Sequence, residues 1–404
     1  MKARVVFLLV VIFALTYGGW FMYRNFRGSG PAFGPIPSIT SNPPTQTTGA
    51  IAATNTTGLP LTLPERISIG TFAKNLGNPR VLIFDPEGTL LVSIPSQSKV
   101  VALPDRNVDG TADEMITVVE GLHLPHGLAF RDGNIYIAET NQVAMYDYNA
   151  KTKKAGNKKK LFDLPGGSNH FSRTIGFGPD GKLYTSIGSS CNACHEKDAR
   201  RAKIFISNAD GTGFREFASG LRNSVFFVWH PVTRQMWATD MGRDLLGDDV
   251  PPDEVNIVQN GRFYGWPYCY GNRVHDRTFD STDDAKRKCE GSEPPHIAFQ
   301  AHSAPLGLTF IPDSWPEEYR GDLLVSYHGS WNRSVPTGYK IVRFDLNSQL
   351  AATREIDFIS GFLQTSPAGE GAFGRPVDLL FDTKGTLFVS DDKAGVIYQV
   401  TAAQ

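Results

Sequence analysis

A chain of 404 residues with 41% hydrophobic and 20% charged residues has the composition of a globular protein, and 40 glycines and 26 prolines favour short strands joined by many turns. The length is large for an ordinary domain but suits one domain built from β repeats. The formal net charge of −1 provides no basic surplus, so we expect no nucleic-acid partner.

The first 27 residues form a separate segment, an apolar run over 5–23 with basic residues on both sides. A run of this length, at about 1.5 Å per residue, just spans a hydrocarbon core. No small-residue cleavage site closes it, so we predict a retained transmembrane helix in 1–27, with a cleaved signal peptide as the alternative. Such a helix usually directs export of the domain that is attached to it, which predicts a periplasmic or extracytoplasmic domain anchored to the inner (cytoplasmic) membrane.

Residues 28–61 are rich in Pro, Thr, Ser, Gly and Asn and contain few large apolar side chains. They bury too little surface to offset the entropy of ordering, which predicts a flexible linker.

Beyond the linker, an apolar strand, a turn of Pro, Asp or Gly and a second alternating strand recur together. The anchoring aromatic residues of the six copies are Phe84, Phe130, Phe177, Trp229, Phe310 and Phe381, at intervals of 46, 47, 52, 81 and 71 residues. A period of about 45 residues with hairpins is typical of β-propeller blades. The sequence therefore predicts an all-β, six-bladed propeller over 62–404, with insertions at about 241–303 and 348–373. Segments 66–72 and 395–400 are expected to complete one blade and close the ring.

Four cysteines, Cys191, Cys194, Cys269 and Cys289, predict two local disulfides in an exported domain. Cys191–His195 also matches the C-x-x-C-H pattern of c-type haem attachment. That segment follows a predicted strand directly and has no helical domain around it. A disulfide is therefore favoured over haem or a bound metal.

Polar side chains recur at equivalent positions beside the repeated strands, where a propeller places loops over its central channel. Those before the strands are His126, His170, Arg173, Arg222, Asn223, His302 and Arg375, and those after them are Glu139, Asp240, His328 and Asp391. Because equivalent blade positions converge on the axis, we expect a pocket there. Any one of these residues alone is more often a satisfied loop residue.

Seven motifs occur in order from about residue 66 to the end of the chain: 169–173 (NHFSR), 188–194 (GSSCNAC), 220–223 (GLRN), 264–270 (YGWPYCY), 302–307 (HSAPLG), 328–333 (HGSWNR) and 374–378 (GRPVD). Together they resemble the quinoprotein sugar dehydrogenases that bind pyrroloquinoline quinone (PQQ), and within them the sorbosone dehydrogenase branch. That family consists of six-bladed propellers, in agreement with the repeat count.

The resemblance implies PQQ and Ca²⁺ as cofactors. His170 matches the general base that takes the sugar hydroxyl proton as hydride passes to the quinone, and histidine suits this task. Arg222 matches the arginine that stabilises negative charge on the quinone oxygen, with Asn223 beside it. The soluble glucose enzymes have an aspartate where this chain has Asn169.

Further cofactor-binding positions implied by the resemblance are Arg173, His328, Trp331, Arg333 and Arg375. Arg375 matches a cation that pairs with a PQQ carboxylate, which a guanidinium binds bidentately. His328 stands where the glucose enzymes carry a PQQ-binding lysine. Trp331 is expected to stack on a quinone or sugar ring, with a buried propeller aromatic as the alternative.

Ca²⁺ is expected in the segment 242–254. Gly242 and Arg243 match positions whose backbone carbonyls hold the ion in the family, and Asp253 and Glu254 add carboxylates, which suit this hard cation. The alternative for the acidic residues is a solvated turn.

We therefore predict a membrane-tethered dehydrogenase that depends on PQQ and Ca²⁺ and oxidises a sugar hemiacetal or aldehyde, sorbosone-like or aldose, to a lactone or acid. Its electrons pass to an external quinone or cytochrome. The alternative is a non-redox propeller, either a Ca²⁺-dependent lactonase-like hydrolase or a carbohydrate- or protein-binding module.

Overall fold

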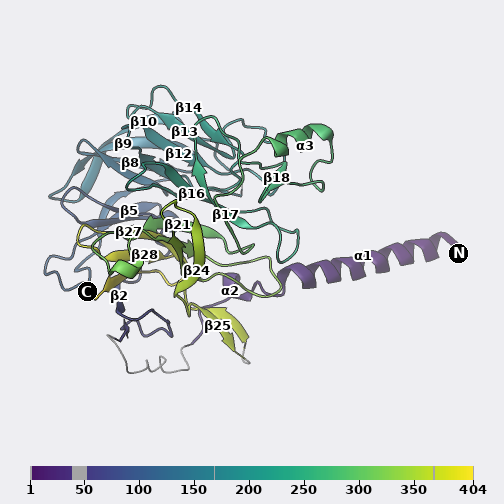
Figure 1. Ribbon diagram of the computed structural model, residues 1–404, viewed down its shortest axis with the longest axis horizontal. Helices are drawn as coiled ribbons and strands as arrows, with labels where there is room; N and C mark the ends of the chain where they lie inside the picture. Colours follow the sequence, from purple (N-terminus) through teal and green to yellow (C-terminus); the bar gives the residue numbers. More distant parts are fainter. Residues whose placement is uncertain (1, 39–51, 168, 367–368, 404) are drawn as a thin grey trace.

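The computed structural model describes residues 2–38, 52–167, 169–366 and 369–403. Six antiparallel sheets surround one axis and form the predicted six-bladed propeller (Figure 1). The first strand of each blade contacts the first strand of at least one neighbouring blade, so the first strands lie nearest the axis. The repeat found in the sequence is therefore the inner half of a blade.

The first three blades are built from consecutive strands. Blade 1 comprises β3 (Leu82–Phe84), β4 (Leu90–Ile94), β5 (Lys99–Leu103) and β6 (Ile116–Glu120). Blade 2 comprises β7 (Leu128–Arg131), β8 (Asn134–Glu139), β9 (Gln142–Asn149) and β10 (Lys154–Asp163). Blade 3 comprises β11 (Ile175–Phe177), β12 (Leu183–Ile187), β13 (Lys203–Ser207) and β14 (Arg215–Ser219).

The next two blades carry the insertions. Blade 4 comprises β15 (Phe227–Trp229), β16 (Met236–Asp240), β17 (Asp253–Val258) and β20 (Ile297–Phe299). Its insertion holds a hairpin of β18 (Cys269–Tyr270) and β19 (Val274–His275), followed by α3 (Asp283–Glu290). Blade 5 comprises β21 (Pro305–Phe310), β22 (Leu323–Tyr327), β23 (Lys340–Leu346) and β24 (Ala352–Ile359). The hairpin of β25 (Leu363–Ser366) and β26 (Gly369–Ala372) follows it, and two 3₁₀ turns span Pro95–Gln97 and Glu317–Tyr319.

The ring closes through the N-terminal strand, as predicted. Blade 6 consists of β27 (Pro376–Phe381), β28 (Leu387–Asp391), β29 (Val396–Ala402) and β2 (Ile67–Ala73), and β2 pairs antiparallel with β29 from Ile67 opposite Ala402. A short strand β1 (Thr54–Asn55) lies outside β2. Chain segments from both ends therefore share one sheet, which leaves no open inner edge.

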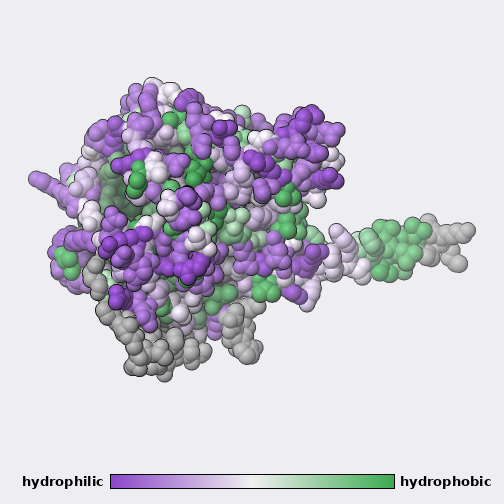
Figure 2. All heavy atoms as spheres, in the orientation of Figure 1, coloured by the Kyte–Doolittle hydropathy of each residue, from purple (hydrophilic) through white to green (hydrophobic). Residues whose placement is uncertain are grey.

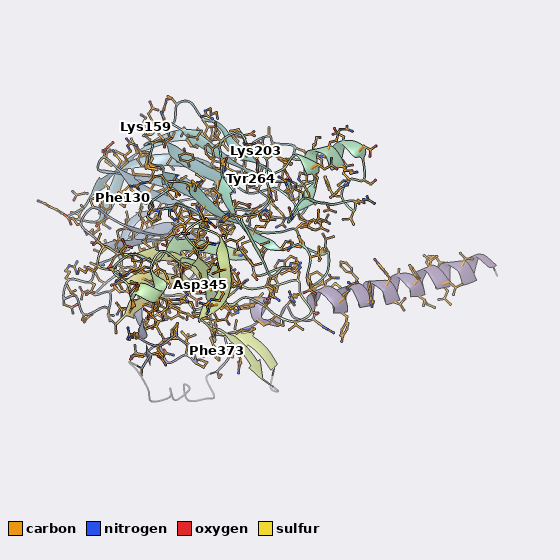
Figure 3. All side chains as sticks on the ribbon, in the orientation of Figure 1. Phe130, Lys159, Lys203, Tyr264, Asp345 and Phe373 are labelled. Carbon is orange, nitrogen blue, oxygen red and sulfur yellow. A yellow bond between two sulfur atoms is a disulfide. The ribbon has the colours of Figure 1, made fainter. Side chains whose placement is uncertain are left out.

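The repeated aromatic residues lie at or next to the ends of the inner strands, and several of them pack between blades. Phe177 of blade 3 meets the Tyr136 ring of blade 2 edge to face at 4.9 Å, and Phe310 of blade 5 meets Trp237 of blade 4 at 5.3 Å. Phe130, labelled in Figure 3, packs instead within blade 2, on Tyr148 at 5.0 Å. Such pairs add packing energy to the area they bury. The period seen in the sequence therefore reflects the packing of one blade on the next.

The antiparallel strands sort the loops onto two faces. Loops that enter a first strand and loops that join the second and third strands of a blade emerge on the same face, which we call the upper face. The turns between first and second strands, such as 230–235 of blade 4, lie on the opposite face.

The N-terminal residues form α1 (Lys2–Phe26), a helix with a candidate membrane span over Val6–Phe26. The most apolar stretch of this span has no residue buried in the protein, whereas Asn25 near its end is buried. The linker prediction for 28–61 is wrong for the described residues on both sides of 39–51. Residues after α1 form α2 (Gly30–Phe33) against β26, and Leu61 is 1% exposed beside the bridge from Thr62 to Ser360. Prolines and glycines here provide close backbone contacts, which composition alone does not reveal. Residues 39–51 lie outside the described part.

Candidate active site

The upper face holds a cavity of about 510 Å³ at the propeller axis. Its lining residues come from the loops of blades 3 to 6 and from α2: Phe33, Asn169, His170, Arg222, Asn223, Met241, Gly242, Asp244, Asp253, His302, Ala304, His328, Gly329, Trp331, Asn332 and Arg375. A cavity of about 670 Å³ on the opposite face is lined by the turns around Glu87, Asp105 and Asp382. None of the predicted site residues lines that second cavity, so we assign the candidate site to the upper face.

His170 enters the cavity from the loop before β11. Its Nδ1 lies 2.9 Å from the carbonyl oxygen of Ser189. A carbonyl only accepts hydrogen bonds, so Nδ1 carries the proton and Nε2 keeps a free lone pair. Gly188 allows this position, because a Cβ there would lie 2.8 Å from the Cβ of His170.

The His170 imidazole is neutral in this environment. Burial, followed by the nearby Arg222 cation, lowers its pKa from 6.5 to about 3. Desolvation and a like charge both disfavour the protonated ring. The ring therefore offers a proton acceptor to the cavity over the whole neutral range.

This shift predicts a pH dependence of apo-protein stability. Between pH 6.5 and about 3 the unfolded chain binds a proton that the folded His170 does not, so stability falls as the pH drops through this window. His170→Gln removes the titrating ring and should flatten this part of the profile. Thermal melts of both proteins at pH 7, 6, 5 and 4 test it. Parallel profiles for the two proteins would show that His170 is not the titrating group.

Arg222 is held rigidly at the edge of the cavity. Its guanidinium donates to the Gly242 carbonyl at 2.9 Å, to Asp244 at 2.8 Å and to both oxygens of Asn192 at 3.0 Å. The carboxylate of Asp240 accepts the backbone N–H groups of Arg222 and Asn223 at 2.9 and 2.7 Å. The cation is thus preorganised beside His170, which is what electrostatic stabilisation of a developing anion needs.

Arg375 and His328 form the other cationic side of the cavity. The Arg375 guanidinium donates to the backbone carbonyls of His328 and Gly329 at 2.9 and 2.8 Å. No carboxylate pairs with it among the described residues. His328 Nε2 contacts Asp392 at 2.8 Å, and burial followed by the Arg375 charge lowers the His328 pKa to about 4. Arg375 therefore has no carboxylate partner among the described residues. An anionic ligand in the cavity would provide one.

Asn332 was not predicted as a site residue, although it lies inside the 328–333 motif. It lines the cavity, is 2% exposed, and neither its side-chain oxygen nor its nitrogen has a hydrogen-bond partner in the structure. Buried amides are almost always satisfied. The unpaired amide facing a cavity therefore points to a polar ligand, a signal that only coordinates reveal.

Two predicted cofactor ligands lie outside the cavity and have structural contacts instead. Arg173 is 0% exposed and donates to the carbonyls of His170, Ser172 and Pro165. Arg333 donates to the carbonyls of Asp248 and Ala301 and to the Asp249 carboxylate. Their donors support the loops that carry the site, and a direct contact of either side chain with a cofactor stays a prediction. Trp331 does line the cavity.

The predicted calcium residues separate into two groups. Asp253 lines the cavity together with Gly242, and its two oxygens accept the N–H groups of Gly242 and Ala304 at 2.9 and 2.8 Å. Burial raises the pKa of Asp253 to about 7. Glu254 is the next residue of β17, so it points to the other side of the strand, where it accepts from Gly271 at 3.0 Å. Its carboxylate does not share a site with Asp253.

The side chain of Arg243 also points away from the cavity and pairs with Asp276. Only its backbone carbonyl is left as a possible ligand, which is the role that the resemblance implied. Gly242 and Asp253 are therefore the predicted calcium ligands that the structure brings to the cavity.

The cysteines form one disulfide, between Cys191 and Cys194. This loop carries Asn192, which binds Arg222, so the crosslink supports a site residue. Cys269 and Cys289 are free and buried, which corrects the predicted second disulfide. The two thiols interact with each other, the Cys269 sulfur also lies 3.4 Å from the Ser292 hydroxyl, and burial raises the pKa of both thiols.

Comparison with known proteins identifies the family of the chain. A family model described as TrAA12-like matches residues 62–403. An uncharacterized protein of Borreliella burgdorferi is 30% identical over 356 residues, which cover 84% of this chain and 90% of the relative. A pyrroloquinoline quinone-dependent sugar dehydrogenase of Hypocrea jecorina is 26% identical over 379 residues, which cover 79% and 84%.

Solved structures share the fold. The calcium structure of the Trichoderma reesei enzyme of family AA12 superposes with a TM-score of 0.73 at 23% identity and covers 85% of this chain and 97% of that one. The holo PQQ domain of the Coprinopsis cinerea pyranose dehydrogenase gives 0.73 at 20% identity and covers 87% and 99%. The chain thus shares its propeller fold with PQQ-dependent sugar dehydrogenases and resembles members of that class in sequence. Within that class, the chain belongs to the TrAA12-like family.

Proposed function

We propose that the protein is a quinoprotein oxidoreductase that oxidises a sugar hemiacetal or aldehyde, of an aldose or a sorbosone-like sugar, to the lactone or acid. One observation carries this proposal: a single cavity holds a neutral histidine (His170), a guanidinium with no carboxylate partner among the described residues (Arg375) and an amide without a hydrogen bond (Asn332). The names of the Hypocrea and Coprinopsis relatives support the assignment of PQQ and a sugar. The Coprinopsis enzyme is longer, and the match spans 52% of it.

The residues of the cavity fit PQQ, an aromatic quinone with carboxylate groups. Arg375 would pair with a carboxylate, and Asn332 and Asn223 would hydrogen-bond its polar edge. Trp331 offers a ring for stacking. Gly242 and Asp253 would hold Ca²⁺ through oxygen atoms, as this ion prefers.

Bound PQQ would supply the two-electron acceptor for hydride from the sugar carbon. His170 Nε2, which has no proton, would accept the proton of the sugar hydroxyl. Arg222, which lies beside the base, would stabilise the negative charge that develops in the cavity. The electrons would then pass to an external quinone or cytochrome outside the cytoplasm.

Titration of the apo-protein with PQQ and Ca²⁺ tests the proposal, followed by dye reduction with a panel of aldoses and sorbosone. We expect saturable binding and sugar-dependent dye reduction. A protein that neither binds PQQ nor reduces dye, or that hydrolyses lactones with Ca²⁺ alone, would contradict it.

Replacing the Asn332 amide is expected to preserve or raise the thermal stability of the apo-protein and to lower its affinity for PQQ. Asn332→Leu replaces an unpaired buried amide by an apolar group of similar size, so the apo-protein should melt at an equal or higher temperature. PQQ affinity should fall about 10-fold, because one hydrogen-bonding group is lost. Thermal melts and PQQ titration measure both effects. A destabilised apo-protein with unchanged affinity would show that Asn332 serves the fold alone.

A further inference from the structure

The end of the candidate membrane helix is attached to the loop that carries Trp331 and Asn332. The backbone N–H of Gly28 donates to the Arg333 carbonyl at 3.1 Å, and Arg27 donates to the Ser334 carbonyl at 3.3 Å. The Phe26 ring lies 5.7 Å from the ring of Trp331, a lining residue of the cavity. The anchor thus contacts the wall of the candidate site.

The segment after α1 stays on the upper face. Phe33 of α2 lines the cavity itself, and Lys393, in the loop after β28, donates to the Gly34 carbonyl at 2.7 Å. Pro37 packs closely on Gly371 of β26. Figure 1 shows α1 leaving the propeller directly from α2, without an extended connection.

Chain length limits the distance between the membrane and the cavity. The candidate span ends at Phe26, whose ring already contacts Trp331, and Gly28 makes a backbone hydrogen bond to the propeller two residues later. Two residues extend at most about 7 Å. If α1 spans a bilayer, the upper face therefore lies at the surface of that bilayer.

Exposed apolar side chains surround the end of the anchor. Phe33 is 74% exposed, Val335 59%, Ile36 49% and Val250 37%. The loops of Val250 and Val335 are joined through the contacts of Arg333 and Ser334 with Asp248. Figure 2 shows α1 as an apolar stalk on a mostly hydrophilic body. Apolar residues at the base of such a stalk suit the interfacial zone of a membrane.

We propose that the upper face docks on the membrane that α1 spans, with lipid covering Phe33, Ile36, Val250 and Val335, so that the cavity opens at the lipid surface. This rests on the predicted anchor and adds to the proposed function a partner of defined chemistry. Residues 26–37 are then a part of the cavity mouth and not a free linker.

Fluorescent labelling of the full chain in phosphatidylcholine–phosphatidylglycerol nanodiscs tests the proposal. Val335→Cys places a polarity-sensitive label on the upper face. Val232→Cys, in the β15–β16 turn on the opposite face, is the matched control and is 80% exposed. We expect spin-labelled lipid to quench the label at 335 at least about three-fold more than the label at 232. Equal quenching at the two positions would overturn the proposal.

Gly28→Val tests whether the docked segment holds this orientation. A Cβ at Gly28 would lie 2.6 Å from the Arg333 carbonyl oxygen, whereas Gly18 has no atom within 4 Å. Gly28→Val should therefore lower quenching at 335 towards the value at 232, and Gly18→Val should not. Unchanged quenching in Gly28→Val would contradict the docked segment. PQQ titration of the labelled proteins that keep Gly28 is independent of quenching. Equal quenching at 335 and 232 in these proteins, together with intact PQQ binding, rejects this inference and leaves the proposed function standing.

Discussion

Replacement of His170 by alanine is expected to lower kcat for sugar oxidation by about 10²–10⁴-fold, the usual contribution of a general base. The Nδ1–H bond to Ser189 fixes the ring so that Nε2 is the proton acceptor in the cavity. The alanine substitution removes this proton acceptor but leaves in place the cations that are expected to pair with PQQ. PQQ affinity should therefore stay within about three-fold of wild type, and the loss should appear in kcat.

His195→Ala is a suitable control, because this histidine is exposed and lies outside the cavity. It should keep wild-type kcat. Stopped-flow reduction of the PQQ-loaded proteins by sugar isolates the chemical step from reoxidation by the dye. Equal reduction rates for His170→Ala and wild type would remove His170 from the role of base.

The fold follows from the sequence because each blade repeats one local pattern. Phe84, Phe177 and Phe381 end equivalent inner strands, so their spacing counts blades directly. The closure by β2 and β29 was also predictable, since a ring of antiparallel sheets needs its two ends paired. The insertions interrupt the period without changing the order of the copies.

Side-chain direction limited the prediction of the site. Asp253 and Glu254 are adjacent acids, but a strand sends them to opposite sides. Arg173 and Arg333 look like free cations in the sequence, whereas backbone carbonyls occupy their donors. Asn332 shows the converse, because nothing in its local sequence indicates that its amide lacks a partner.

The segment 28–61 shows how composition can mislead. The segment contains too few large apolar residues to form a hydrophobic core of its own, as the composition indicates. The described residues 28–38 are instead ordered by single contacts with distant loops, such as Gly28 with Arg333 and Lys393 with Gly34. Contacts between residues about 300 or more positions apart leave no local signal. Phe33 was missed as a cavity residue for this reason.

Arg375→Met is expected to raise the Kd for PQQ by about 30-fold or more, because truncating one partner of a buried charge pair costs about 2–5 kcal/mol. Arg375 already binds the carbonyls of His328 and Gly329, so its fork is fixed before a ligand arrives. Arg375→Lys keeps the charge but loses the planar fork, and should recover only part of the affinity.

Arg354→Met is the control for the loss of a guanidinium, since Arg354 pairs with Asp345 on the outer strands of blade 5 and its side chain is 68% exposed. It should bind PQQ like wild type. Calorimetric titration in Ca²⁺ buffer gives the Kd, and melts of the apo-proteins separate affinity from folding. If Arg375→Met binds PQQ more weakly and still melts cooperatively, Arg375 is the cation that pairs with the cofactor carboxylate. Wild-type affinity in Arg375→Met would instead assign the carboxylate to another part of the cavity.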